Sequence, residues 1–146
     1  MRGENKIVQK IVVDTNVLVS AYFSNTGTSN ALVGLVAEGK IEGYTSIKLM
    51  EEFKNVIQRD FEVSLERAEQ MVDITLQFFK LVEPNTRLKV ISDEADNRVL
   101  ECADYCKANY ITSWDPHLTN LGEFNGIKIM NPGKLLEELK KVHRID

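Results

Sequence analysis

The sequence predicts an α/β fold, a three-layer α/β/α sandwich around a mostly parallel central sheet. Short apolar runs alternate along the chain with longer amphipathic segments, a pattern typical of strands separated by helices. The first run, residues 7–13, is mostly isoleucine and valine and is too short for a buried helix, which indicates a parallel strand covered on both faces. A length of 146 residues suffices for one domain with a conventional core. We therefore expect a single domain over residues 1–146, with its core over about 7–133 and a C-terminal helix over about 132–143.

The first part of the chain supplies strands and helices in this alternation. Serine and threonine commonly cap a helix by accepting a hydrogen bond from its first turn. Thr28 or Ser29, Ser46 and Ser64 are suited to this role, and Gly39 is suited to end a helix. The predicted strands are 7–13 and 41–45, and the predicted helices are 16–23, 28–38, 46–59 and 64–81.

The second part of the chain continues the pattern. Val99, Cys102 and Cys106 recur at helical spacing and form an apolar stripe on one predicted helix. Pro132 suits the first turn of the last helix, which we expect to end at His143. The predicted strands are 88–91 (at a sheet edge), 110–113 and 127–130, and the predicted helices are 94–107 and 132–143.

Composition narrows the class of protein. Hydrophobic residues make up 43% and charged residues 27% of the chain, which fits a globular rather than a disordered protein. No apolar run approaches the ~20 residues that span a bilayer, and residues 1–10 lack the apolar segment of a secretory signal. With only two cysteines, interpreted as core residues, we expect a cytoplasmic protein without a membrane partner. The net charge of −4 argues against a nucleic-acid partner unless the acids gather in a metal-binding cleft.

Four acidic residues are predicted at one end of the sheet. Asp14 follows the first strand and Asp115 follows the strand 110–113, and the carboxyl ends of parallel strands are where ligands bind in such sheets. Glu52 lies beside the apolar stripe of its helix, and Asp96 lies in the first turn of another helix at the edge of its apolar face. Their convergence indicates a cation site.

Each acid also has a purely structural interpretation. Asp14 to Asn16 fits a strand-to-helix turn with Asn16 as the N-cap, and Glu52 fits an ion pair with Lys48. Asp96 fits a helix N-terminus, and Asp115 before a proline fits the start of a turn. It is the four acids together that favour a functional site.

Four segments carry a resemblance to a known family. VVDTNVLVSA, TSIKLMEEFKNVI, SDEADNRVLECA and YITSWDPHL, in this order, resemble the PIN-domain family of ribonucleases, which includes the toxins of VapBC-type toxin–antitoxin pairs. The resemblance runs over about residues 10–133. The positions that match the family's motifs are Asp14 and Asn16 of D-x-N, Glu52, Asp96, Ser113 and Asp115. The sequence departs from the family at His117, where many members have a second aspartate, and at Trp114, where a small residue is usual.

The resemblance implies a metal-dependent endoribonuclease that leaves 5′-phosphate and 3′-hydroxyl ends. Oxygen ligands without a histidine and cysteine set select Mg²⁺ or Mn²⁺. We expect Asp14, Asp96 and Asp115 to hold the ion, and Glu52 to orient or deprotonate water or to bind a second ion. Asn16 and Ser113 are expected to position the carboxylates or the phosphate. The alternative is a non-catalytic PIN-like module that binds RNA or a protein.

The expected partners are RNA, single-stranded or structured, an antitoxin protein and a second copy of this chain. Lys48, Arg59 and Arg98 are candidate phosphate contacts. Trp114 is a candidate to stack a base or, alternatively, to pack beneath the site. The predicted helix 64–81 has a second apolar stripe at Ile74, Phe78 and Leu81, which predicts a homodimer; burial of both stripes within one monomer is the alternative.

Overall fold

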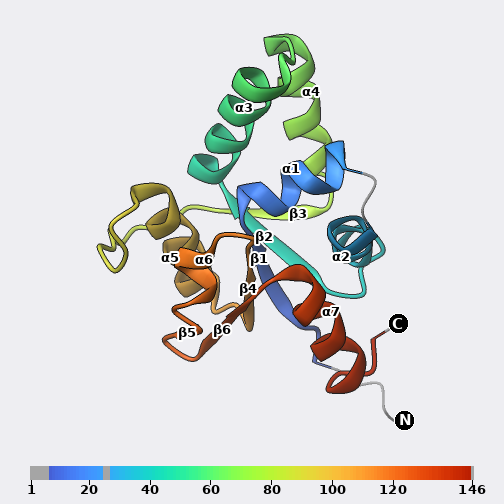
Figure 1. Ribbon diagram of the computed structural model, residues 1–146, viewed down its shortest axis with the longest axis vertical. Coiled ribbons are helices and arrows are strands. Elements are labelled where there is room, and N and C mark those ends of the chain that lie inside the picture. Colours follow the sequence, from blue (N-terminus) through green and yellow to red (C-terminus); the bar gives the residue numbers. More distant parts are fainter. Residues whose placement is uncertain (1–6, 25–26, 146) are drawn as a thin grey trace.

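The predicted three-layer sandwich is confirmed by a computed structural model, which describes residues 7–24 and 27–145 (Figure 1). The sheet has the order β3-β2-β1-β4-β6-β5, and every pairing is parallel except that of β5 with β6. The strands are β1 Lys10–Val13, β2 Glu42–Ser46, β3 Phe79–Val82, β4 Tyr110–Thr112, β5 Glu123–Phe124 and β6 Ile127–Met130. The helices are α1 Thr15–Phe23, α2 Gly27–Ala37, α3 Ile47–Phe61, α4 Leu65–Thr75, α5 Glu94–Cys106, α6 Pro116–Thr119 and α7 Pro132–Lys141.

The central strand β1 is buried on both faces, which explains why it lacks a polar alternation. Ile11 and Val13 belong to a core formed with α1, α2, α3, α4 and α7, and Val12 belongs to a second core formed mainly with α5. Figure 1 shows the sheet between these two groups of helices. The carboxyl ends of β1 and β4 are neighbours in this arrangement, because Val13 lies opposite Thr112.

The predicted helix 64–81 is wrong in its second half. Ser64 caps α4 as expected, but the helix ends at Thr75, and residues 79–82 form the edge strand β3. The side chain of Phe79 packs on β2 at Gly43, where an added Cβ would lie 2.6 Å from its ring. This close approach depends on a glycine in a different strand, so the apolar spacing within 64–81 did not reveal it.

The predicted edge strand 88–91 is also wrong, because this segment has no strand partner in the described part of the chain. The short elements α6 and β5 lie between the predicted strands 110–113 and 127–130 and are too brief to produce a periodic pattern. No helix among the described residues is long and apolar enough to cross a membrane.

The second apolar stripe does not exist as predicted, because its three residues do not share a helix. Ile74 lies in α4, Phe78 lies between elements and packs against the first core, and Leu81 lies in β3. Ile74 and Leu81 are nevertheless exposed, at 40% and 46%. The homodimer therefore stays a prediction without the helical stripe that suggested it.

Candidate metal centre

Asp14 is fixed at the junction of β1 and α1. It is the N-cap of α1, and one carboxylate oxygen accepts a hydrogen bond from the Thr15 amide at 2.7 Å. The other oxygen accepts the Ser113 hydroxyl at 2.6 Å and the Asn16 amide at 3.3 Å. The cap is therefore Asp14 rather than Asn16, the structural alternative considered from sequence. With 8% of its surface exposed, this carboxylate is held in one orientation.

Ser113 and Asn16 join the ends of β1 and β4. The hydroxyl group of Ser113 donates a hydrogen bond to Asp14. Its oxygen atom also accepts a hydrogen bond from the backbone amide of Asp115 at 2.9 Å. The side-chain oxygen of Asn16 accepts the amide of Trp114 at 3.0 Å. The two residues thus link the end of β1, at Asp14, to the end of β4, at Trp114 and Asp115.

Asp96, Asp115 and His117 form a compact group of ligand atoms. One atom from each lies within 4.8 Å of the others. Asp96 is in the first turn of α5 and is only 5% exposed, and its Oδ2 atom is buried without a hydrogen-bond partner in the described structure. A buried carboxylate oxygen without a donor is costly unless a cation or a proton compensates it.

The electrostatics of the acids favour cation binding. Burial, followed by repulsion from Asp115 and Asp14, raises the pKa of Asp96 to about 7. Burial also raises the pKa of Asp14 to about 6 against the opposing hydrogen bonds from Ser113 and Thr15, and repulsion from Asp115 and Glu52 adds to the increase. A divalent cation would offset both burial and mutual repulsion, because it favours the charged form of each acid.

Glu52 lines a cleft together with Asp14. The cleft has a volume of about 330 Å³, and its lining includes Asp14, Glu52, Lys48 and Arg98. Glu52 is half-buried on α3 and raises the pKa of Asp14 through repulsion. The structure thus brings Glu52 to the same cleft as Asp14, but the compact ligand group consists of Asp96, Asp115 and His117.

Two of the three basic residues that were predicted to contact phosphate line the cleft, and the third does not. Lys48 is exposed and lines the cleft. Arg98 also lines it, but its guanidinium pairs with Glu101 at 2.7 Å, so part of its charge is already neutralised. Arg59 is exposed, pairs with Asp60 at 2.8 Å and is not among the residues that line the described cleft.

Trp114 is both exposed and anchored. Its surface is 42% exposed, and its indole N–H donates to the hydroxyl of Ser29 at 3.1 Å. The ring is thus partly exposed and partly packed, and stacking of a base on it stays a prediction. Cys102 and Cys106 are free buried thiols, as expected for core residues, and burial raises the pKa of both.

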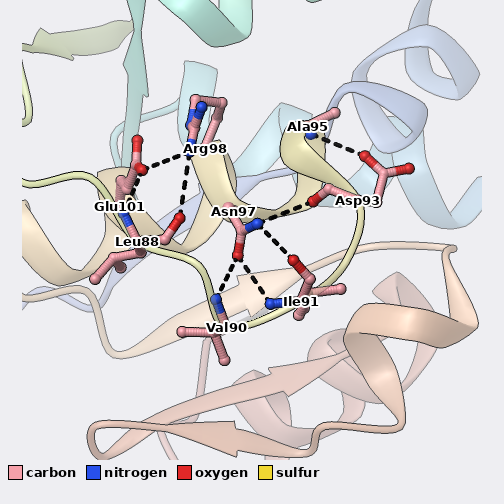
Figure 2. A network of polar contacts seen from close by, with 8 residues as sticks. All are labelled: Leu88, Val90, Ile91, Asp93, Ala95, Asn97, Arg98 and Glu101. Atoms are coloured by element: carbon pink, nitrogen blue, oxygen red, sulfur yellow. Dashed lines mark hydrogen bonds and ion pairs between the residues drawn. The ribbon is translucent and has the colours of Figure 1, made fainter.

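The segment 88–91 forms a wall beside α5 (Figure 2). The side-chain oxygen of Asn97 accepts the amides of Val90 and Ile91 at 2.9 and 3.0 Å, and its amide donates to the Ile91 carbonyl at 2.6 Å. Glu101 accepts the Leu88 amide at 2.7 Å. These side chains satisfy backbone groups that a neighbouring strand would otherwise have satisfied.

Asn97→Ala is expected to lower the free energy of unfolding by about 2–3 kcal/mol, since it leaves several backbone groups of the 88–91 segment without partners. Urea denaturation measures this loss. Asn120→Ala, at an exposed position, is the control and is expected to change stability by less than about 0.5 kcal/mol. Equal stability of Asn97→Ala and the wild type would show that these bonds do not anchor the segment.

Sequence reasoning missed several residues around the cleft. Arg87 and Asn55 line it, and Asn97 and Glu101 bind the segment 88–91 that follows Arg87. Asn97 and Glu101 sit four apart next to the apolar stripe of α5, and such buried-side polar residues are a readable signal of a backbone contact. Arg87 lies in a loop, where no periodicity marks its direction.

Comparisons with known proteins identify the family and the fold. An uncharacterized protein of Methanocaldococcus jannaschii, MJ1680, is 30% identical over 154 residues, covering 97% of this chain and 98% of its own. A chain in the crystal structure of VapBC2 from Rickettsia felis, bound to a DNA fragment from their promoter, has a similar fold, with a TM-score of 0.62 and 12% identity over 84% of this chain and 98% of that one. A family model described as PIN domain matches residues 10–117, the span that carries all four acids. The chain therefore belongs to the PIN-domain family, as its sequence motifs predicted.

Proposed function

We propose that this protein is an endoribonuclease that uses Mg²⁺ or Mn²⁺ to hydrolyse RNA phosphodiester bonds. Asp96 carries the proposal: its Oδ2 is buried without a hydrogen-bond partner among the described residues, and one of its carboxylate oxygens lies within 4.8 Å of possible ligand atoms of Asp115 and His117. Membership of the PIN-domain family supports the same activity.

The residues present fit a divalent cation. Asp96 and Asp115 supply carboxylate oxygens, the type of ligand that Mg²⁺ and Mn²⁺ prefer, and Asp14 adds negative charge beside them. A cation bound there would withdraw electron density from the phosphoryl group and lower the pKa of a water beside it.

The protein's own groups then have separate roles. Ser113 and Asn16 hold Asp14 through hydrogen bonds to one of its oxygens. Glu52, at the cleft, accepts the proton of the attacking water. The water oxygen bonds to phosphorus, the bond from phosphorus to the 3′-oxygen breaks, and the 3′-oxygen takes a proton from solvent. The products are a 5′-phosphate and a 3′-hydroxyl.

The substrate strand enters along the cleft. Lys48 and Arg87 are exposed cations on its lining, and Arg98 adds a partly neutralised one. They offset the charge of the phosphates that must approach an acidic centre. The partly exposed ring of Trp114 offers a surface on which a base can stack.

The proposal extends to partners and compartment. The fold similarity to a chain from VapBC2 supports an antitoxin partner that would restrain the activity in the cytoplasm. Ile47 of α3 and Leu81 of β3 are exposed and line one hollow with residues of α4, which offers a surface for an antitoxin or a second copy. Size-exclusion chromatography with light scattering tests the homodimer.

The direct test is cleavage of a mixed RNA pool with Mg²⁺ or Mn²⁺, followed by sequencing of the new ends. We expect internal cuts with 5′-phosphates, and none when EDTA replaces the ion. Lys48→Ala is expected to raise KM more than it lowers kcat, while Lys140→Ala, an exposed lysine on α7, leaves both unchanged. RNA binding without cleavage under any of these ions would instead favour a non-catalytic binding module.

A further inference from the structure

His117 is the residue that distinguishes this ligand group from a cluster of acids. It lies in α6, two residues after Asp115, and its Nδ1 atom is 3.4 Å from Asp115 Oδ1. Its ring nitrogen also belongs to the group in which one atom each from Asp96, Asp115 and His117 lie within 4.8 Å of one another. A cation between the carboxylates would therefore have a nitrogen donor within reach.

An ordinary surface ion pair does not account for this arrangement. The His117 side chain is 76% exposed, and an exposed pair with Asp115 contributes little to stability. Nor does such a pair compensate Asp96, whose buried Oδ2 has no hydrogen-bond partner among the residues described. Asp115 caps α6 by accepting the backbone amide of His117 at 2.9 Å, which holds the histidine beside the acids, and a cation shared by the three side chains would compensate Asp96.

The exposures of the three side chains also fit a partly open site. Asp96 is buried at the base of the group, the Asp115 side chain is 25% exposed, and the His117 side chain reaches the surface. Protein ligands on one side leave the remaining positions of an ion accessible from solvent, as catalytic metal sites require.

We propose that His117 is a direct nitrogen ligand, together with Asp96 and Asp115, and that it makes this site prefer Mn²⁺ over Mg²⁺. This inference rests on the proposed metal-dependent function and specifies the ion. Mg²⁺ takes oxygen ligands almost exclusively, whereas imidazole binds transition metals well. A neutral ring in place of a carboxylate leaves less negative charge for either divalent cation, so the expected preference for Mn²⁺ comes from the nitrogen donor.

The test uses Mn²⁺ as a paramagnetic probe. The chain has two histidines, His117 and His143, so ¹⁵N-labelled histidine gives a simple spectrum. In the wild type we expect the electron spin-echo envelope of bound Mn²⁺ to be modulated by a directly coordinated ¹⁵N nucleus. We expect this modulation to be lost in His117→Ala and kept in His143→Gln. His143 is a matched control because it contacts Tyr110 at 2.8 Å, away from the acid group.

Calorimetric titration gives an independent readout. We expect His117→Ala to weaken Mn²⁺ binding by about tenfold or more and Mg²⁺ binding by less. We expect His117→Asp to bring the two affinities closer together by favouring Mg²⁺. Unchanged Mn²⁺ affinity in His117→Ala, with no ¹⁵N modulation in the wild type, overturns this inference and leaves the proposed function standing. Absence of any Mn²⁺ or Mg²⁺ binding to the wild type overturns both.

Discussion

Asp96→Asn is expected to abolish RNA cleavage while raising the free energy of unfolding in metal-free buffer. The variant removes a carboxylate whose pKa is raised to about 7 by burial and by neighbouring acids, so it relieves repulsion in the folded state. It also removes a ligand oxygen. Loss of a group that only supports a metal ligand costs about 10–100-fold, so we expect more than about 100-fold loss of activity here.

The matched control is Asp104→Asn, on the same helix. It makes the same change of charge, and an asparagine oxygen can still accept the Asn125 amide that contacts Asp104 at 3.1 Å. Cleavage by this variant is expected to equal that of the wild type. Asp14→Asn should lose cleavage as Asp96→Asn does but gain less stability, because both Asp14 oxygens accept hydrogen bonds. Undiminished cleavage by both variants would refute the assignment of the acids. Cleavage kinetics measure the loss of activity in each variant, and urea denaturation measures the change in its free energy of unfolding.

The metal-free protein is expected to lose stability as the pH rises from about 4 to about 7. An aspartate whose pKa is raised in the folded state keeps its proton there while the unfolded chain has lost it, so the folded state is progressively penalised over this range. For Asp14, a rise from 3.8 to about 6 corresponds to about 3 kcal/mol. Urea denaturation in EDTA at several pH values measures this slope, and Asp14→Asn should flatten it.

Mn²⁺ or Mg²⁺ is expected to reverse this loss. A ligand that binds only the folded state stabilises by about 2.7 kcal/mol at 100 times its Kd. Because the ion competes with protons for the carboxylates, the increase in Tm should be larger near pH 7.5 than near pH 5. A flat pH profile in EDTA combined with no metal-induced increase would contradict both the electrostatic account and the metal centre.

The positions of the residues at the ends of the central strands could be predicted from the sequence, but the edge strand β3 could not. Asp14 and Asp115 follow apolar runs whose pairing is set by their burial on both faces, so their proximity followed from the fold class. By contrast, β3 depends on Gly43, which makes room for Phe79 in another strand. Such a contact between distant residues produces no local pattern.

The partner of Arg98 and the role of His117 could not be predicted from the sequence. The spacing of α5 placed Asp96 at the edge of its apolar face, but it gave no reason for Arg98 to pair with Glu101 rather than with substrate. His117 was noted only as a departure from the family. What made it a candidate ligand was the position of α6, a helix too short to predict from periodicity.

Helix α5 carries two adjacent residues that contact different parts of the protein. Asp96 faces the acids, and the next residue, Asn97, fastens the 88–91 segment (Figure 2). Successive residues of a helix differ in direction by about 100°, so one rotation of α5 would misalign the carboxylate and detach the segment together. Helix α5 therefore fixes the distance between Asp96 and the segment 88–91, and under the proposed function substitutions that tilt this helix should change both the position and the rate of RNA cleavage.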